Sequence, residues 1–138
     1  PIDFAVKPIE YLNDIKIKEG LNTLFPLKED IFNLNKDYSI FFDLVIEYTC
    51  FCAIDPQKRR QYVKLVNSIL NKSGQFIALF FPTERREEDI GKGPPFYVNL
   101  EETLSMFENN FNILKIDKNP DSIKPRQGFE TLIIMDKK

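Results

Sequence analysis

Three acidic residues, Asp3, Asp30 and Glu47, lie where segments predicted to be strands end. In an open parallel sheet, ligands bind outside the carboxyl ends of the strands. A carboxylate there can accept hydrogen bonds from both hydroxyls of a ribose, and an acidic or amide group beside an apolar wall can bind the amino group of adenine. Each of the three also has a structural interpretation, as a helix N-cap or as part of a solvated turn. Together they favour a nucleoside-type ligand.

Histidine, glycine and cysteine usage limits the chemistry. The 138 residues contain no His, which excludes a Ser-His-Asp or Cys-His nucleophile, a histidine base and imidazole metal sites. The few glycines do not cluster in a strand-to-helix turn, so neither a dinucleotide fingerprint nor a P-loop is present. Cys50 and Cys52 are interpreted as buried thiols on one face of a strand, because two cysteines without His supply too few ligands for zinc. We expect no metal.

Charge and hydropathy limit the partners. The chain has 19 Lys and Arg against 21 Asp and Glu, and a net charge of -2 argues against a nucleic acid or a polybasic membrane contact. No apolar stretch approaches the ~20 residues of a membrane span, and the N-terminus lacks the features of a signal peptide. We therefore expect a soluble, cytoplasmic protein with no membrane partner. The sequence begins with Pro1 rather than Met, so its first residue need not be the biological start.

A βαβ unit is the clearest element of structure. Residues 41–47 form an apolar run that continues through 48–52 and predicts a parallel strand covered on both faces. A helix follows, with Asp55 as its N-cap and Gly74 at its end. Residues 75–81 predict a second buried strand, which completes the unit.

The flanking segments extend this α/β pattern. Upstream, we predict a strand end at residues 1–4, a short helix from Pro8 and a strand over 23–27. Downstream, Asn99 caps a helix. Two further strands, 111–116 and 131–135, have no helix between them and should therefore pair antiparallel. The prediction is one α/β domain spanning residues 1–138, with a mostly parallel sheet and an antiparallel C-terminal strand.

A long connection over residues 82–98 separates the second strand from the helix capped by Asn99. It contains three of the nine prolines and two of the five glycines. Loops of this length are usually functional or disordered, so a lid over a site and a solvated excursion are both open.

Three segments carry a resemblance to a known family. They are KEDIF at residues 28–32, FDLVIEYTCFCAIDPQKRRQYVKLVNSILNKSGQFIALFFP at 42–82 and GPPFYV at 93–98. Together they resemble the thiopurine S-methyltransferase family, especially its halide and thiol methyltransferase branch. The resemblance implies a Rossmann-like class I methyltransferase with a seven-stranded sheet. It also implies S-adenosylmethionine as cofactor and a small soft nucleophile, such as a thiol, thiocyanate, halide or thiopurine, as methyl acceptor.

The resemblance also implies residue roles. Asp3 matches the acid that holds the ribose hydroxyls, and Asp30 with Ile31 matches the pair beside the adenine. The stretch Glu47, Tyr48 and Thr49 matches residues that face the methionine part and the methyl group, which makes Tyr48 the candidate catalytic residue.

The resemblance extends to the acceptor side, where Phe96 and Tyr97 match the loop that closes over the acceptor. Phe51, Phe96 and Tyr97 would form aromatic walls, although core packing is the alternative for Phe51. Thiolates and halides are already nucleophiles, so their methylation requires alignment and desolvation more than a general base. This chemistry is compatible with a chain that has no His.

One departure from the family is large. The family's first strand and its glycine-rich turn, which should precede Pro1, are absent, and this loss would split the sheet. The chain is therefore expected to be an N-terminally incomplete methyltransferase. The alternative is a non-catalytic relic or interaction module that self-associates through exposed sheet edges.

Overall fold

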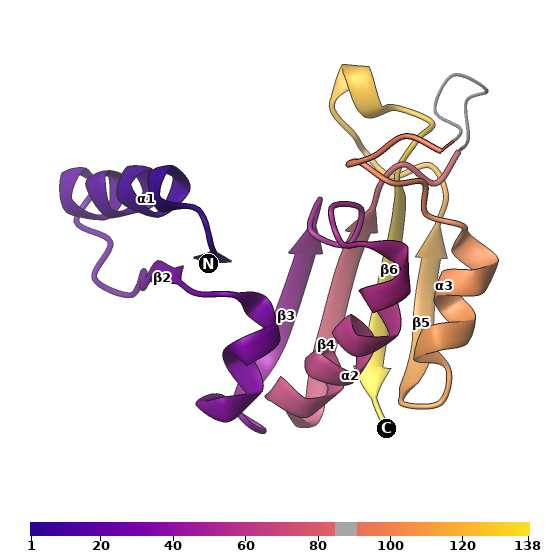
Figure 1. Ribbon diagram of the computed structural model, residues 1–138, viewed down its shortest axis with the longest axis horizontal. Coiled ribbons are helices and arrows are strands. Elements are labelled where there is room, and N and C mark those ends of the chain that lie inside the picture. Colours follow the sequence, from indigo (N-terminus) through magenta and orange to yellow (C-terminus); the bar gives the residue numbers. More distant parts are fainter. Residues whose placement is uncertain (85–90) are drawn as a thin grey trace. The chain divides into compact units, whose positions relative to one another are not determined.

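The computed structural model describes residues 1–84 and 91–138 and divides into two compact units, Pro1–Tyr38 and Ser39–Lys138 (Figure 1). The six strands of the described residues form a two-stranded sheet and a four-stranded sheet. The prediction of one domain over residues 1–138 therefore stays a prediction.

The first unit is built around two short parallel strands, β1 (Ile2–Asp3) and β2 (Leu27–Lys28). Helix α1 (Val6–Lys18) joins them, and a 3-10 segment, η1 (Ile31–Lys36), follows β2. The predicted helix exists but begins before Pro8 and is longer than expected. The strand predicted over 23–27 is wrong except for Leu27, since the pairing with β1 covers only two residues.

The second unit contains a sheet with the order β3-β4-β6-β5. Its strands are β3 (Phe42–Tyr48), β4 (Leu70–Phe80), β5 (Phe111–Asp117) and β6 (Thr131–Lys137). Strands β3 and β4 are parallel, whereas β6 runs antiparallel to both of its neighbours, β4 and β5. The predicted α/β fold, with parallel strands and an antiparallel C-terminal strand, is confirmed.

The connection from β3 to β4 contains the predicted helix. Asp55 accepts a hydrogen bond from the Gln57 amide at 2.9 Å and caps a 3-10 turn, η2 (Pro56–Lys58), which leads into α2 (Arg59–Ile69). The helix ends at Ile69 rather than at Gly74, and β4 begins directly after it. The Lys137 ammonium donates to the carbonyl of Leu70 at 2.7 Å, which stabilises this early end.

Helices α2 and α3 (Leu100–Phe107) lie on the same face of the four-stranded sheet (Figure 1). Asn99 caps α3 as predicted, accepting from the Glu102 amide at 3.0 Å. Beneath these helices aromatic rings form the core, with Phe76 and Phe107 stacked at 5.3 Å between centroids. Fully burying a ring of this size contributes about 2 to 3 kcal/mol.

Strand β3 differs from its prediction as a strand covered on both faces. The side chains of Leu44, Ile46 and Tyr48 are 44%, 69% and 48% exposed, respectively. They share one face of the strand because alternate side chains point the same way. Among the described strands, β3 pairs only with β4, so it forms an edge of its sheet.

Candidate functional site

A buried carboxyl organises the chain just after β3. Glu47 is 2% exposed, and its Oε1 accepts hydrogen bonds from the amides of Cys50 and Phe51, each at 2.8 Å. The chain reverses at Thr49, whose φ of 62° lies in the left-handed region that β-branched residues rarely adopt. Residues 50–52 therefore form a turn, and the predicted continuation of the strand to Cys52 is wrong.

The environment of Glu47 raises the pKa of its carboxyl to about 7. Burial disfavours the charged form, and the two backbone hydrogen bonds only partly offset this effect. Its other oxygen, Oε2, is buried and has no hydrogen-bond partner in the described part of the chain. The side chain thus supports the 48–52 turn from inside, and a contact with a cofactor stays a prediction.

The loop between β5 and β6 brings a cation to this turn. Arg126, at the end of η4 (Lys124–Arg126), places its guanidinium 5.0 Å from the ring centroid of Tyr48 and 4.7 Å from that of Phe81. One guanidinium nitrogen, Nη1, lies 3.3 Å from Oε1 of Glu130, whose side chain is 1% exposed. The guanidinium therefore lies against the rings of Tyr48 and Phe81 and is paired with a buried carboxylate. Sequence analysis missed Arg126 because nothing local distinguishes it from other loop arginines.

Arg126 lines a cavity of about 270 Å³ at the carboxyl ends of β3 and β4. The other described residues around it are Thr49, Cys52, Ala53, Phe81, Pro94 and Pro95. None of these is acidic, so the lining combines a guanidinium, which is itself paired with Glu130, with apolar and aromatic walls. Such a lining suits a small anion whose hydration shell is removed on binding.

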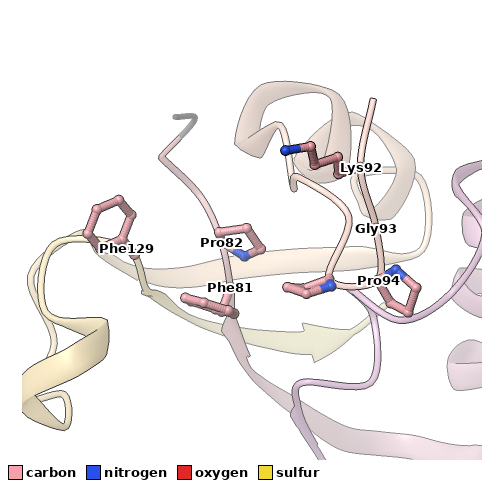
Figure 2. Close-up of a pocket in the computed structure, with 7 residues that line it drawn as sticks. Phe81, Pro82, Lys92, Gly93, Pro94 and Phe129 are labelled. Carbon is pink, nitrogen blue, oxygen red and sulfur yellow. The ribbon is translucent and has the colours of Figure 1, made fainter. Parts of the chain in front are cut away.

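A second cavity, of about 330 Å³, adjoins the first and shares Phe81, Pro94 and Pro95 with it. Figure 2 shows Phe81, Pro82 and Phe129 around this cavity, together with Lys92 from the segment that follows the undescribed residues. The described linings of the two cavities contain Arg126 and Lys92 but no carboxylate.

Cys52 is not suited to act as a nucleophile in the first cavity. Burial, reinforced by the charge of Glu47, raises the pKa of its thiol. The thiol also donates to the Thr49 carbonyl at 3.3 Å. It therefore stays protonated at neutral pH and packs as a small apolar group. Cys52 is buried as predicted, whereas Cys50 is half-buried, and the turn removes the strand on which both were placed.

The predicted acceptor loop is described over residues 91–98, and the part of the predicted lid at 85–90 lies outside the described residues. A Cβ atom on Gly93 would lie 2.2 Å from Cδ1 of Phe96, so the Phe96 ring folds back over Gly93. Tyr97 lines a separate hollow beside α3. Of the residues in this loop, Pro94 and Pro95 line the cavity that contains Arg126 (the Arg126 cavity), whereas Phe96 and Tyr97 do not.

Phe51 lies in the core. Its side chain is 0% exposed, and its ring centroid is 5.0 Å from that of Phe80 and 5.6 Å from that of Tyr62. This position agrees with the packing alternative for Phe51 rather than with an aromatic wall.

The remaining candidate residues belong to the first unit. Asp3 accepts from the Ala5 amide at 2.7 Å, and Asp30 accepts from the Phe32 amide at 2.9 Å, so both act as local caps. Because β1 and β2 are parallel, Asp3 and the Asp30–Ile31 pair follow the same end of the two-stranded sheet. The structure thus brings the candidates together in two groups, one in each unit.

Comparison with known proteins identifies the family. A model of the family described as "Thiopurine S-methyltransferase (TPMT)" matches residues 5–137. The chain belongs to this family. It is 33% identical over 111 residues to thiocyanate methyltransferase 1 of Arabidopsis thaliana, covering 77% of this chain and 44% of that protein. It is also 33% identical over 92 residues to a probable thiol methyltransferase 2 of the same plant. The chain spans less than half the length of these relatives.

Solved structures support the same fold. A protein from Pyrococcus horikoshii superposes with a TM-score of 0.77 at 18% identity, covering 99% of this chain and 70% of that one. A Burkholderia thailandensis N1-methyltransferase, solved with S-adenosylhomocysteine, superposes with a TM-score of 0.69 at 16% identity, covering 99% and 59%. The fold is therefore that of class I methyltransferases.

The described residues contain neither a membrane-spanning helix nor a cluster of metal ligands. None of their helices has the length and apolar character needed to cross a membrane. Within the same residues, no three or more Cys, Asp or Glu side chains gather as metal ligands would.

Proposed function

We propose that the protein acts in S-adenosylmethionine-dependent methyl transfer to a small soft nucleophile: a thiol, thiocyanate, a halide or a thiopurine. The observation that carries this proposal is the cavity lined by Arg126 and Phe81 beside Tyr48, at the carboxyl ends of β3 and β4. It combines a guanidinium, paired on one side with Glu130, with the apolar walls that a soft anion requires. Two relatives are named as a thiocyanate methyltransferase and a probable thiol methyltransferase, and these names point to the same acceptor class.

The cofactor residues of the proposal are Asp3, Asp30, Ile31 and the stretch 47–49. In the first unit, Asp3 and Asp30 each use Oδ1 for a local backbone amide. Neither side chain is fully buried, so each carboxylate can also accept a hydrogen bond from a ribose hydroxyl or an adenine amino group. When bound, S-adenosylmethionine supplies its methyl group as an electrophile on a sulfonium sulfur.

Tyr48 is the proposed catalytic residue. Its ring is 48% exposed, lies beside the Arg126 guanidinium and directly precedes the strained Thr49. Since a soft anion needs no general base, the residues around the cavity act by binding the anion, orienting it and removing water from it.

The test is a direct assay for methylated products. The chain is incubated with S-adenosylmethionine and thiocyanate, iodide or bisulfide, and the headspace is analysed for methyl thiocyanate, methyl iodide and methanethiol. Isothermal titration calorimetry with S-adenosylhomocysteine measures cofactor binding independently. Arg126→Gln is expected to raise the acceptor KM by roughly 10-fold or more, because a charged hydrogen-bond donor is lost. Since the buried Glu130 also loses its ion-pair partner, circular dichroism must show that the variant is folded. Lys124→Gln, an exposed change in the same turn, is the control. The proposal is refuted if a chain extended upstream of Pro1 gives neither a methylated product nor a heat of cofactor binding.

A second candidate is an interaction module that self-associates through a sheet edge. The observation that favours it is the exposed face of β3 at Leu44 and Ile46, on a strand whose outer edge has no partner among the described strands. Light scattering tests this candidate: a monomer at micromolar concentration would exclude it.

A further inference from the structure

Arg59 is a buried charged residue at the start of α2. It is 6% exposed, and the ion pairs of the described residues do not include it. A buried guanidinium is costly unless its donors are used. The hydrogen bonds of the Arg59 guanidinium should therefore show why the charge is buried here.

Two of the guanidinium nitrogens donate to successive backbone carbonyls, whereas Nε is buried without a partner among the described residues. Its Nη1 lies 3.0 Å from the oxygen of Tyr97 and its Nη2 lies 3.4 Å from the oxygen of Phe96. Its central carbon lies 4.7 Å from the ring centroid of Phe51, which fixes the plane of the fork from the core side. A planar fork of donors suits two neighbouring acceptors, whereas the point charge of a lysine does not.

The segment that receives these bonds forms a wall of the Arg126 cavity. That wall is made by Pro94 and Pro95, which have no backbone N–H to donate. The wall is therefore anchored through the residues after it. The Phe96 amide donates to the Cys52 carbonyl at 2.7 Å, and the Val98 amide donates to the Pro82 carbonyl at 2.9 Å.

We infer that Arg59 is a positioning residue, which fixes the Pro94–Pro95 wall of the cavity by holding the carbonyls of residues 96 and 97. The inference rests on the proposed function only for the identity of the molecule in the cavity. It predicts that loss of the fork loosens the wall while the sheet stays intact.

Amide hydrogen exchange measured by NMR tests the inference in Arg59→Met and Arg59→Lys. The Phe96 and Val98 amides are expected to exchange at least about tenfold faster in Arg59→Met, because two charge-assisted hydrogen bonds are lost. Arg59→Lys is expected to restore less than half of this protection, although it retains the charge. Arg60→Met, an exposed change at the next position, is the matched control. Amides of the ladder between β4 and β6 should be unaffected in all variants.

Any of three exchange results would overturn the inference. Unchanged exchange at Phe96 and Val98 would show that the fork does not hold the segment. A uniform increase that includes the β4–β6 ladder would show that Arg59 only adds global stability. Full rescue by Arg59→Lys would likewise overturn it, since a point charge would then suffice.

The link to the cavity is tested by titrating the same proteins with sodium thiocyanate against sodium chloride at equal ionic strength. In Arg59→Met the dissociation constant for thiocyanate is expected to rise about tenfold or more, with S-adenosylhomocysteine binding unchanged. Equal thiocyanate affinity despite faster exchange would overturn the role of Arg59 at the cavity. No binding of either ligand to the unsubstituted chain would instead count against the proposed function, and the exchange data would still decide the role of Arg59.

Discussion

Glu47 makes the stability of this protein depend on pH in an unusual direction. The pKa of its carboxyl is about 7 in the folded chain, against an ordinary value of 4.5. Between these two values the folded state keeps the proton and the unfolded state releases it. The contribution of the protonated Glu47 carboxyl to stability is therefore fully present below about pH 4.5 and is lost as the pH rises through 7.

The size of the effect follows from the difference between the two pKa values. Each pKa unit corresponds to about 1.4 kcal/mol, so raising the pH from 5 to 8 should remove roughly 2 to 3 kcal/mol. Glu47→Gln removes the titration, but its amide oxygen can still accept from the Cys50 and Phe51 amides. The stability of the variant relative to the unsubstituted protein should therefore rise by roughly 2 to 3 kcal/mol between pH 5 and pH 8.

Urea denaturation followed by circular dichroism, at several pH values from 5 to 8, measures this difference. Glu108→Gln, an exposed carboxyl at the end of α3, is the control and should change the free energy of unfolding by no more than about 0.5 kcal/mol at any pH. If the curves of Glu47→Gln and the unsubstituted protein stay parallel from pH 5 to 8, the carboxyl is not held protonated by burial, and the reasoning fails.

Three further substitutions test local features of the second unit. Asn99→Ala removes the cap that accepts from the Glu102 amide and should lower stability by about 1 kcal/mol in a thermal melt; an unchanged Tm would contradict this role. Phe76→Ala empties a site that is 0% exposed and should cost about 3 to 5 kcal/mol in urea denaturation, whereas a loss below about 1 kcal/mol would mean that the core is loosely packed. Gly93→Ala places a Cβ 2.2 Å from the Phe96 ring and should shift the Phe96 NMR signals strongly without changing the sheet; unshifted signals would place the ring elsewhere.

Local signals in the sequence predicted the βαβ unit and the C-terminal helix. Asp55 and Asn99 act as caps because each lies immediately before a run with helical periodicity, and a cap needs only the next two or three amides. The antiparallel pairing of β5 and β6 was also predictable, since no helix lies between them.

The errors came from contacts that are distant in the sequence or hidden in a side chain. Gly74 predicts a later helix end, but the Lys137 side chain, which lies 67 residues further along the sequence in β6, donates to the Leu70 carbonyl. The apolar run after Tyr48 predicts a continuing strand, but the Glu47 carboxyl folds back onto the Cys50 amide and makes a turn. Neither contact leaves a periodic signal.

The same distinction applies to the candidate site. The stretch 47–49 could be named from the sequence because it follows the clearest strand and matches a family pattern. Arg126 could not, since its contact with Tyr48 joins residues that only the fold brings together. The roles of Asp3 and Asp30 in cofactor binding stay predictions that rest on the resemblance, beside the capping bonds that both residues make.

The position of β6 has a consequence for the order in which the second unit can fold. This strand is the last of the described strands in the sequence, yet it lies between β4 and β5 (Figure 1). During synthesis β4 and β5 therefore emerge without the strand that joins them, and each exposes an unpaired edge until residues 131–137 arrive. Pairing β4 with β6 also requires closing a long loop, which slows folding. The sheet should thus be completed only after these residues have left the ribosome, and a nascent chain that stops short of them would be prone to aggregate.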